Sequence, residues 1–484
     1  MGVFEATNVS FLLYFFLALV APKAPTEMIM FTKHTEKMKL MAHQEETVTK
    51  QLDTPKFYNA SSPGVGKTIT SLAAWNRRKG AKRLLVLAPK TIMQASWGND
   101  IEKFIPTATY AVAIAGVKRE RAFASGAEIV ITNHDAVKWL AKNTHLLKDF
   151  TDLVVDEMTA FKNRTSARSK ALRELRKFFE VRVGMSGTPT PNGVCDIWHQ
   201  MLVIDDGETF GKQFSAFQAQ VCTPAPVPGV PGATKWTDKP DSPMLVADRM
   251  KQRSVRFQLE ECIDLPPNVV QTIEVALPPA LMKKYHDFKK QAVLELESGE
   301  IDAVSAGVLA NKLLQLTSGV IYDQHGDEHT VHTERAELVT ELVQESGAAV
   351  VAFLWRHQKD QLLKLAENAG IRYGVIDGSV PLDERARVVE KFQNGLLDAV
   401  YAHPASAGHG LTLTRGNTTI WTSPTFNAEF YKQFNARIHR NGQKNKTRTI
   451  HIAASNTYEL EVYEKLSGKV NSMQSLLDVL KLGR

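Results

Sequence analysis

Ala60-Ser61-Ser62-Pro63-Gly64-Val65-Gly66-Lys67-Thr68 is a glycine-rich stretch that ends in Lys-Thr. Its glycines let backbone N–H groups approach phosphate oxygens with no Cβ in the way. Lys67 supplies a positive charge for the β- and γ-phosphates of a nucleotide, and Thr68 supplies a hydroxyl for Mg²⁺. The stretch therefore predicts a phosphate-binding loop, formed chiefly by Gly64, Val65 and Gly66.

A helix is expected directly after this loop, over residues 69–76, so that its N-terminus faces the anion. The strict loop pattern has Gly at the position of Ser61 in this chain. A chance turn in a surface loop is the alternative interpretation.

An acidic pair, Asp156-Glu157, directly follows the apolar residues Val154-Val155. A carboxylate just past a buried strand can hold Mg²⁺, and its neighbour can orient or deprotonate an attacking water. The alternative is a solvated turn at the end of a strand. Together with the preceding loop, however, the pair predicts a site that binds ATP and Mg²⁺ and hydrolyses ATP.

Short apolar runs alternate with helix-forming stretches along most of the chain. The runs are residues 84–88, 128–132, 153–155 and 181–186 in the first half, and 348–354, 373–376, 398–402 and 418–421 in the second. Helices are expected over residues 166–179 and 359–369. Buried strands that alternate with helices indicate parallel sheets in two α/β units. Functional residues are then expected at the carboxyl ends of the strands.

The composition fits a folded protein with several domains. The chain has 484 residues, of which 43% are hydrophobic and 23% are charged. Its net charge of +7 is compatible with a polyanionic partner but does not by itself indicate one. The three cysteines have no CxxC spacing, which argues against a zinc site or a disulfide framework and favours a reducing compartment.

Two segments fall outside the α/β pattern. Residues 11–21 form an apolar run that is too short for a membrane-spanning helix, which needs about 20 residues. We interpret residues 1–27 as a poorly packed extension or the product of an upstream start, with a signal peptide or anchor as the alternative. Residues 222–243 are rich in Pro and Gly and predict a loop or linker.

A third motif, residues 433–443, places Arg437 and Arg440 three positions apart. On a helix they share one face, where two guanidinium groups can stabilise charge that develops on a γ-phosphate. An exposed basic helix face is the default interpretation of such spacing.

In order, these motifs resemble those of superfamily 2 helicases, and specifically of Swi/Snf-like double-stranded DNA translocases. The resemblance covers residues 38–465. Gln44 matches a motif that reads adenine, Asp156-Glu157 matches the DEAH box, and both arginines match the fingers of the last helicase motif. Further matches lie at residues 85–97, 131–134, 186–192, 265–267 and 407–414.

Two departures from the family pattern stand out. Met158 and Thr159 replace Ala-His in the DEAH box, which puts in doubt the coupling contact that this His usually makes. His409 replaces a Gly in the motif around residue 410. The chain is also compact and has no obvious accessory domain, which suggests a phage or bacterial member that works in the cytoplasm.

The resemblance implies two tandem RecA-like α/β domains with parallel sheets and ATP in the cleft between them. The expected boundaries are an N-terminal extension over 1–37, a first domain over 38–221, a connecting region over 222–334 and a second domain over 335–484. The resemblance implies catalytic roles for Lys67, Asp156, Glu157, Arg437 and Arg440, and Mg²⁺ binding by Thr68 and Asp156. It implies nucleotide contacts for Gln44, Gly64, Val65, Gly66, Lys67, Thr68, Gly410 and Gln433.

The expected track is DNA, held through its phosphates and therefore without sequence preference. Candidate contacts at the carboxyl edges of the sheets are Lys90, Thr91, Thr132, Asn133 and Thr412. No stacking aromatics are obvious near these motifs, which favours tracking on duplex DNA. A strand-separating DNA or RNA helicase stays open as an alternative, as does a nucleic-acid clamp that binds ATP without hydrolysing it.

Overall fold

The computed structural model describes residues 39–226, 234–262, 264–297, 312–322, 328–330, 332–407, 411–464 and 466. Residues 38–484 form one compact unit. The N-terminal apolar run lies outside the described residues. Among those described, no helix is long and apolar enough to cross a membrane.

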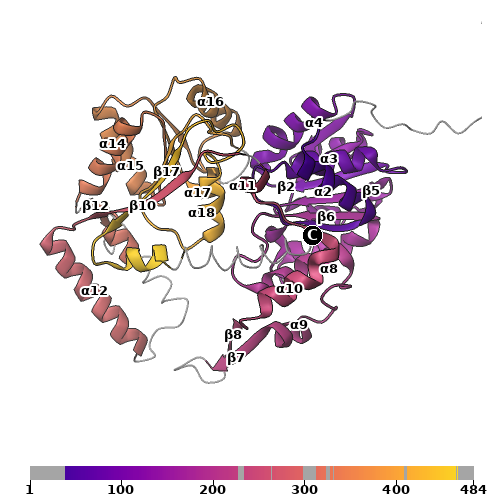
Figure 1. Ribbon diagram of the computed structural model, residues 1–484, viewed down its shortest axis with the longest axis horizontal. Helices are drawn as coiled ribbons and strands as arrows, with labels where there is room; N and C mark the ends of the chain where they lie inside the picture. Colours follow the sequence, from indigo (N-terminus) through magenta and orange to yellow (C-terminus); the bar gives the residue numbers. More distant parts are fainter. Residues whose placement is uncertain are drawn as a thin grey trace, which may run out of the picture. The chain divides into compact units, whose positions relative to one another are not determined.

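The first half of the chain builds a seven-stranded sheet in the order β3-β4-β2-β5-β6-β1-β9. Figure 1 labels its strands β2, β5 and β6. All its neighbouring strands pair in parallel. The strands are β1 Lys56–Asn59, β2 Arg83–Ala88, β3 Tyr110–Ala113, β4 Ile129–Asn133, β5 Phe150–Asp156, β6 Val181–Met185 and β9 Ser254–Val255.

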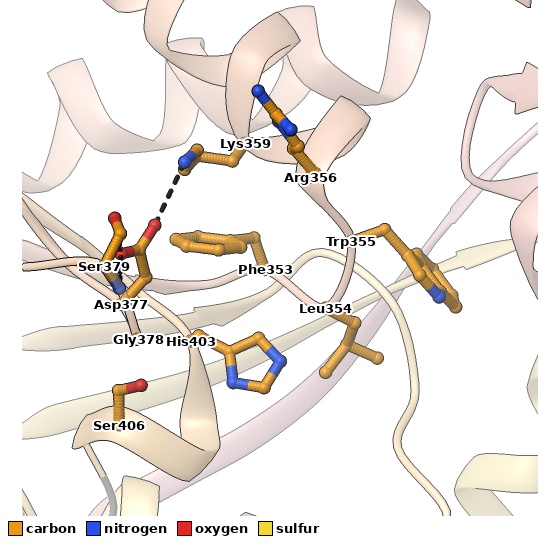
Figure 2. A pocket seen from close by; sticks show the side chains of 10 residues that line it. All are labelled: Phe353, Leu354, Trp355, Arg356, Lys359, Asp377, Gly378, Ser379, His403 and Ser406. Atoms are coloured by element: carbon orange, nitrogen blue, oxygen red, sulfur yellow. Dashed lines mark hydrogen bonds and ion pairs between the residues drawn. The ribbon is translucent and has the colours of Figure 1, made fainter. Parts of the chain in front are cut away.

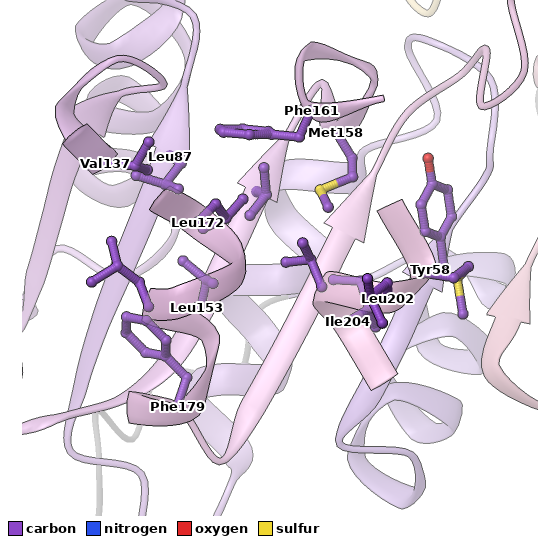
Figure 3. Close-up of a cluster of buried hydrophobic side chains, with 14 of the residues drawn as sticks. Tyr58, Leu87, Val137, Leu153, Met158, Phe161, Leu172, Phe179, Leu202 and Ile204 are labelled. Carbon is purple, nitrogen blue, oxygen red and sulfur yellow. The ribbon is translucent and has the colours of Figure 1, made fainter. Parts of the chain in front are cut away.

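Both faces of this sheet are buried, which explains why its strands read as continuous apolar runs. In β2, Leu85 and Leu87 join one hydrophobic cluster, while Leu84 and Val86 join a second. Successive side chains of a strand point to opposite faces, so the two clusters cover the two sides of the sheet. Figure 3 shows the first cluster, where strand residues meet side chains from the helices α7 and α8.

The second half builds a six-stranded sheet in the order β10-β17-β16-β13-β15-β14, again parallel throughout. Its strands are β10 Asn268–Val275, β13 Ala349–Ala352, β14 Tyr373–Ile376, β15 Ala399–Ala402, β16 Thr418–Trp421 and β17 Thr447–Ala454. The predicted fold class, two α/β domains with parallel sheets, is confirmed.

Helices connect the strands, as parallel pairing requires. Those of the first half are α2 Ala42–Asp53, α3 Lys67–Arg77, α4 Asn99–Phe104, α5 Gly116–Ala124, α6 Ala136–Leu140, α7 Ala167–Leu175, α8 Ile197–Asp205, α9 Phe214–Val221, α10 Ser242–Met250 and α11 Leu259–Cys262. Those of the second half are α12 Pro279–Glu297, α14 Glu334–Ser346, α15 Arg356–Asn368, α16 Leu382–Gln393, α17 Pro404–Ala407 and α18 Ala428–Asn435.

The stretch 222–243, predicted as a loop or linker, is partly regular. β7 Cys222–Pro226 and β8 Thr234–Asp238 form an antiparallel hairpin, and α10 begins at Ser242. The prolines of β7 are tolerated because this two-stranded ribbon has open edges. A second two-stranded ribbon joins β11 Val320–Tyr322 to β12 Glu328–Thr330.

Strands from the predicted connecting region complete both sheets. β9 pairs with β1 at one edge of the first sheet, and β10 pairs with β17 at one edge of the second. The short segment between β9 and β10 therefore runs directly from one sheet to the other.

A buried ion pair ties the second domain together and gives a stability prediction. The Arg335 guanidinium on α14 contacts the Glu459 carboxylate, which also accepts hydrogen bonds from Thr317 Oγ1 at 2.8 Å and Ala454 N at 2.5 Å. Glu459→Ala leaves a buried guanidinium without its counter-charge and is expected to cost about 3–5 kcal/mol of unfolding free energy. The measurement is the urea denaturation midpoint.

The matched control is the exposed pair between Arg448 and Glu345, whose N···O distance is 3.0 Å. Glu345→Ala is expected to cost at most about 1 kcal/mol, because solvent already screens that pair. Equal shifts in the two variants would contradict the structural role of Glu459.

Candidate nucleotide and nucleic-acid site

The glycine-rich loop lies between the end of β1, a strand that the sequence did not predict, and the start of α3, the helix expected directly after the loop. Gly64 and Gly66 have φ of +89° and +91°, in the left-handed region that favours glycine. A Cβ on Gly66 would lie 2.4 Å from Gln44 Nε2. This amide donates to Val65 O at 3.1 Å, and so Gln44 holds the loop as well as facing the site.

The Lys67 ammonium is folded back onto its own loop. It donates to Ser61 O at 2.9 Å and to Ser62 O at 3.2 Å. Burial lowers the pKa of Lys67, and the nearby Glu157 and Asp156 carboxylates oppose this shift. The loop therefore concentrates a cation beside an acidic pair, where an anionic ligand that carries a divalent metal fits.

Asp156 is the last residue of β5, the carboxyl end where a parallel sheet places its functional groups. Trp97 Nε1 donates to its Oδ2 at 2.9 Å, and the backbone N–H of Glu157 donates to its Oδ1 at 3.0 Å. Burial raises the pKa of Asp156, and the Trp97 hydrogen bond opposes the rise. Trp97 thus holds the carboxylate in one orientation.

Glu157 has a φ of +51°, which is unusual for a residue with a Cβ. Such strain persists where the surrounding structure fixes the conformation, often at a functional site. Its Oε2 accepts from Ser186 Oγ at 3.4 Å, and Ser186 Oγ also accepts from Thr188 N at 3.1 Å. Burial and the neighbouring Asp156 raise the pKa of Glu157, which suits a group that accepts a proton.

Arg437 and Arg440 follow α18 in the second half of the chain. Arg437 Nε donates to Gln433 O at 2.7 Å, and Arg440 Nη1 donates to Leu411 O at 2.8 Å. Burial, followed by the neighbouring Arg440, lowers the pKa of Arg437 to about 9. Backbone carbonyls therefore hold both guanidinium groups in place.

One cavity of about 530 Å³ brings the predicted groups together. The first half of the chain contributes Gln44, Gly64, Gly66, Lys67, Thr68, Asp156 and Glu157, and the second half contributes Thr412, Arg437 and Arg440. Two predicted nucleotide contacts, Val65 and Gln433, do not line this cavity. Gly410 lies outside the described residues.

The cavity has the donor set that Mg²⁺ prefers. The Asp156 carboxylate and the Thr68 hydroxyl both line it and supply hard oxygen ligands. Within the described residues, no group of three or more His, Cys, Asp or Glu side chains forms a metal cage. Mg²⁺ is usually bound by one or two protein groups together with phosphates and water, so the two residues fit this ion.

Comparison with known proteins identifies the family. The model of the SNF2-related domain matches residues 60–320, and that of the helicase conserved C-terminal domain matches residues 334–442. The chain belongs to the SNF2-related family. The predicted resemblance to Swi/Snf-like ATPases of superfamily 2 is thereby confirmed.

Three relatives show how much of this SNF2-related chain is shared. "Putative protein p41" of Acyrthosiphon pisum secondary endosymbiont phage 1 is 27% identical over 91% of the chain and 98% of its own length. Mouse "Chromodomain-helicase-DNA-binding protein 1-like" is 25% identical over 86% of the chain and 47% of its own length. An "Uncharacterized ATP-dependent helicase" of Mycoplasma pneumoniae is 25% identical over 89% of the chain and 41% of its own length. The chain thus spans less than half of the latter two relatives.

The predicted nucleic-acid contacts of this SNF2-related chain differ in their surroundings. Lys90 is exposed beyond the end of β2, next to Thr91. Thr132 is buried and donates to Ala113 O at 2.7 Å, while Asn133 is buried and accepts from Arg119. Thr412 lines the nucleotide cavity. These five residues therefore do not form one surface.

A second cavity, of about 580 Å³, lies where β13, β14 and β15 end (Figure 2). Its polar and basic lining comes from Arg356, Lys359, Asp377, Ser379 and His403. Lys359 Nζ lies 3.0 Å from Asp377 Oδ2. Sequence reasoning missed this cavity, although two basic residues after a predicted strand were a signal that could have found it.

Thr159, which replaces the His of the DEAH box in this SNF2-related chain, has a hydrogen-bond partner in the second half of the chain. Thr159 Oγ1 donates to Glu429 Oε1 at 3.1 Å, and Gln433 Nε2 donates to the same oxygen at 3.1 Å. Glu429 and Gln433 belong to α18, and so a side-chain network links the end of β5 to the helix before the two arginines. Sequence reasoning did not identify Glu429.

Proposed function

We propose that the protein is an ATP-driven translocase that moves along double-stranded DNA. The observation that carries the proposal is the cavity of about 530 Å³, which joins a phosphate-binding loop and an acidic pair to two arginines from the other half of the chain. A protein that only bound ATP would need neither Glu157 nor the arginines.

In the proposed reaction, backbone N–H groups of the loop and the Lys67 ammonium hold the β- and γ-phosphates. Asp156 and Thr68 hold Mg²⁺, which neutralises phosphate charge when bound. Glu157 accepts a proton from the attacking water as the water bonds to the γ-phosphorus and the bond from this phosphorus to the β,γ-bridging oxygen breaks, so that ADP leaves. Arg437 and Arg440 stabilise the charge on the phosphoryl group during its transfer to water.

Movement follows from the division of this site between two sheets. The loop and the acidic pair follow strands of the first sheet, whereas both arginines follow α18 in the second half. Hydrolysis then requires contact between the two halves, and product release permits their separation. The Thr159–Glu429 hydrogen bond is one contact that such a cycle would make and break.

DNA is the proposed track for reasons of charge and position. The chain carries a net charge of +7, and exposed Lys90 and Arg356 follow strands at the carboxyl edges of the two sheets. Two relatives carry helicase in their names, and the mouse relative is also named as DNA-binding. Contacts of this kind hold phosphates, so binding is expected to tolerate any sequence.

The test compares ATP hydrolysis with duplex DNA, single-stranded DNA and RNA at equal nucleotide concentration. Duplex DNA is expected to stimulate hydrolysis most, and the stimulation is expected to fall steeply with salt because counterions are released on binding. Stimulation by RNA alone would exclude the proposed track. Stimulation by single strands alone would favour a strand-separating helicase.

A pair of arginine variants makes the test site-specific. Arg356 is exposed at the carboxyl end of β13, whereas Arg372 precedes β14 and pairs with Asp398 at the opposite edge. Arg356→Ala is expected to weaken DNA binding uniformly across sequences and to reduce the salt slope by about 1. Arg372→Ala is the control and is expected to leave both unchanged.

A further inference from the structure

The phosphate-binding loop is braced by a segment that follows it by almost two hundred positions. β9 extends the sheet beyond β1, and its ladder continues into the loop. Ala60 N donates to Val255 O at 2.9 Å, and Ser62 N donates to Phe257 O at 2.9 Å. The first half of the loop is therefore held like an additional stretch of strand.

Side chains add to this backbone ladder at the two serines. Phe257 N donates to Ser61 Oγ at 3.1 Å, and Arg256 Nη1 donates to Ser62 Oγ at 3.0 Å. Arg256 Nη1 also donates to Phe257 O at 2.6 Å. Gly in place of Ser61 would have no hydroxyl to accept the first of these bonds, which gives a physical reason for this departure from the strict loop pattern.

The braced residues are the same ones that hold the catalytic lysine. Lys67 donates to the carbonyl oxygens of Ser61 and Ser62. The hydroxyl groups of both serines and the N–H of Ser62 bond to the 255–257 segment. Arg256 is only 1% exposed and lies close enough to Lys67 for their charges to interact. The position of the loop therefore depends on a residue outside it.

We propose that Arg256 is a positioning residue of the nucleotide site, which fixes the loop through the Ser62 hydroxyl and the Phe257 carbonyl. The inference rests on the proposed ATP-hydrolysing function. Under this proposal, the segment after β9 contributes to ATP affinity. The same segment continues into β10 of the second sheet, so ATP affinity depends on the chain that connects the two sheets.

The test measures binding of a fluorescent ADP analogue and the KM and kcat for ATP in the full chain. Arg256→Met is expected to raise the nucleotide Kd and the KM roughly tenfold, the effect of losing a hydrogen bond to a charged donor, with a smaller change in kcat. Arg256→Lys keeps a cationic donor and is expected to restore part of the affinity. Arg253→Met is the matched control, because Arg253 precedes the same strand but pairs with Glu208.

Ser62→Ala keeps the inference testable if Arg256→Met fails to fold, because it removes only the hydroxyl that Arg256 contacts. It is expected to raise the Kd in the same direction, and the effect of Arg256→Met is expected to be smaller in its background. Unchanged nucleotide affinity in a folded Arg256→Met or in Ser62→Ala would overturn the inference. If the unmodified chain neither binds nor hydrolyses ATP, the proposed function fails instead.

Discussion

Glu157→Gln is expected to slow ATP hydrolysis by about 10²- to 10⁴-fold, the usual contribution of a positioned general base. The amide keeps the shape of the side chain but cannot take the proton of the attacking water. ATP binding is expected to persist, because the loop and the Lys67 ammonium are unchanged. Single-turnover hydrolysis and equilibrium binding of ATP measure the two effects separately.

Two further variants are compared with Glu157→Gln. Lys67→Ala is expected to abolish turnover and, unlike Glu157→Gln, to lower ATP affinity, since it removes the cation that faces the phosphates. Glu180→Gln is the matched control, because Glu180 precedes β6 at the opposite edge of the same sheet and is exposed. Undiminished hydrolysis in both Lys67→Ala and Glu157→Gln would refute the assigned site.

All eight apolar runs that the sequence predicted as strands correspond to strands in the structure. Such runs are typical of strands in parallel sheets that are covered on both faces. Several of the missed strands lack such a run, even where they are buried: β17 is buried along most of its length, but its sequence TRTIHIAA mixes polar and apolar residues. β10 is largely exposed along its length, and β9 has two residues whose strand character depends on pairing with β1. Pairing between distant segments cannot be read from a local pattern.

The candidate site likewise contains residues that the sequence predicted and residues that it did not predict. Motif order was sufficient to predict Lys67, Asp156-Glu157 and the two arginines, which line one cavity. Residues that act through others carry no local motif. The hydrogen bond of Arg256 to Ser62 and that of Glu429 to Thr159 each join positions far apart in the chain.

Exposure was the property that sequence reasoning predicted least well. Thr132 and Asn133 were expected to face a nucleic acid, but both are buried and bonded to protein groups. At the carboxyl edge of a parallel sheet, the last residue of a strand can still be covered by the neighbouring connections. The roles of these residues and the domain boundaries stay predictions.

Arg437→Ala is expected to lower the kcat for ATP hydrolysis by about 10³- to 10⁵-fold, the range known for arginine fingers. Burial and the neighbouring Arg440 lower the pKa of Arg437, and an anionic γ-phosphate in the same cavity would stabilise its charge. That stabilisation grows as charge develops in the transition state, so ATP affinity is expected to change far less than kcat. Arg437→Lys keeps a charge but not the planar fork and is expected to recover little activity.

The control for Arg437 is Arg448→Ala on β17, since Arg448 is partly exposed and pairs with Glu345 outside the cavity. Its kcat and KM are expected to match those of the unmodified chain. A loss of ATP affinity with kcat unchanged in Arg437→Ala would show that Arg437 binds the ground state and the transition state equally well. Such a result would mean that the halves of the chain are already in contact before the chemical step, and that closure does not limit hydrolysis.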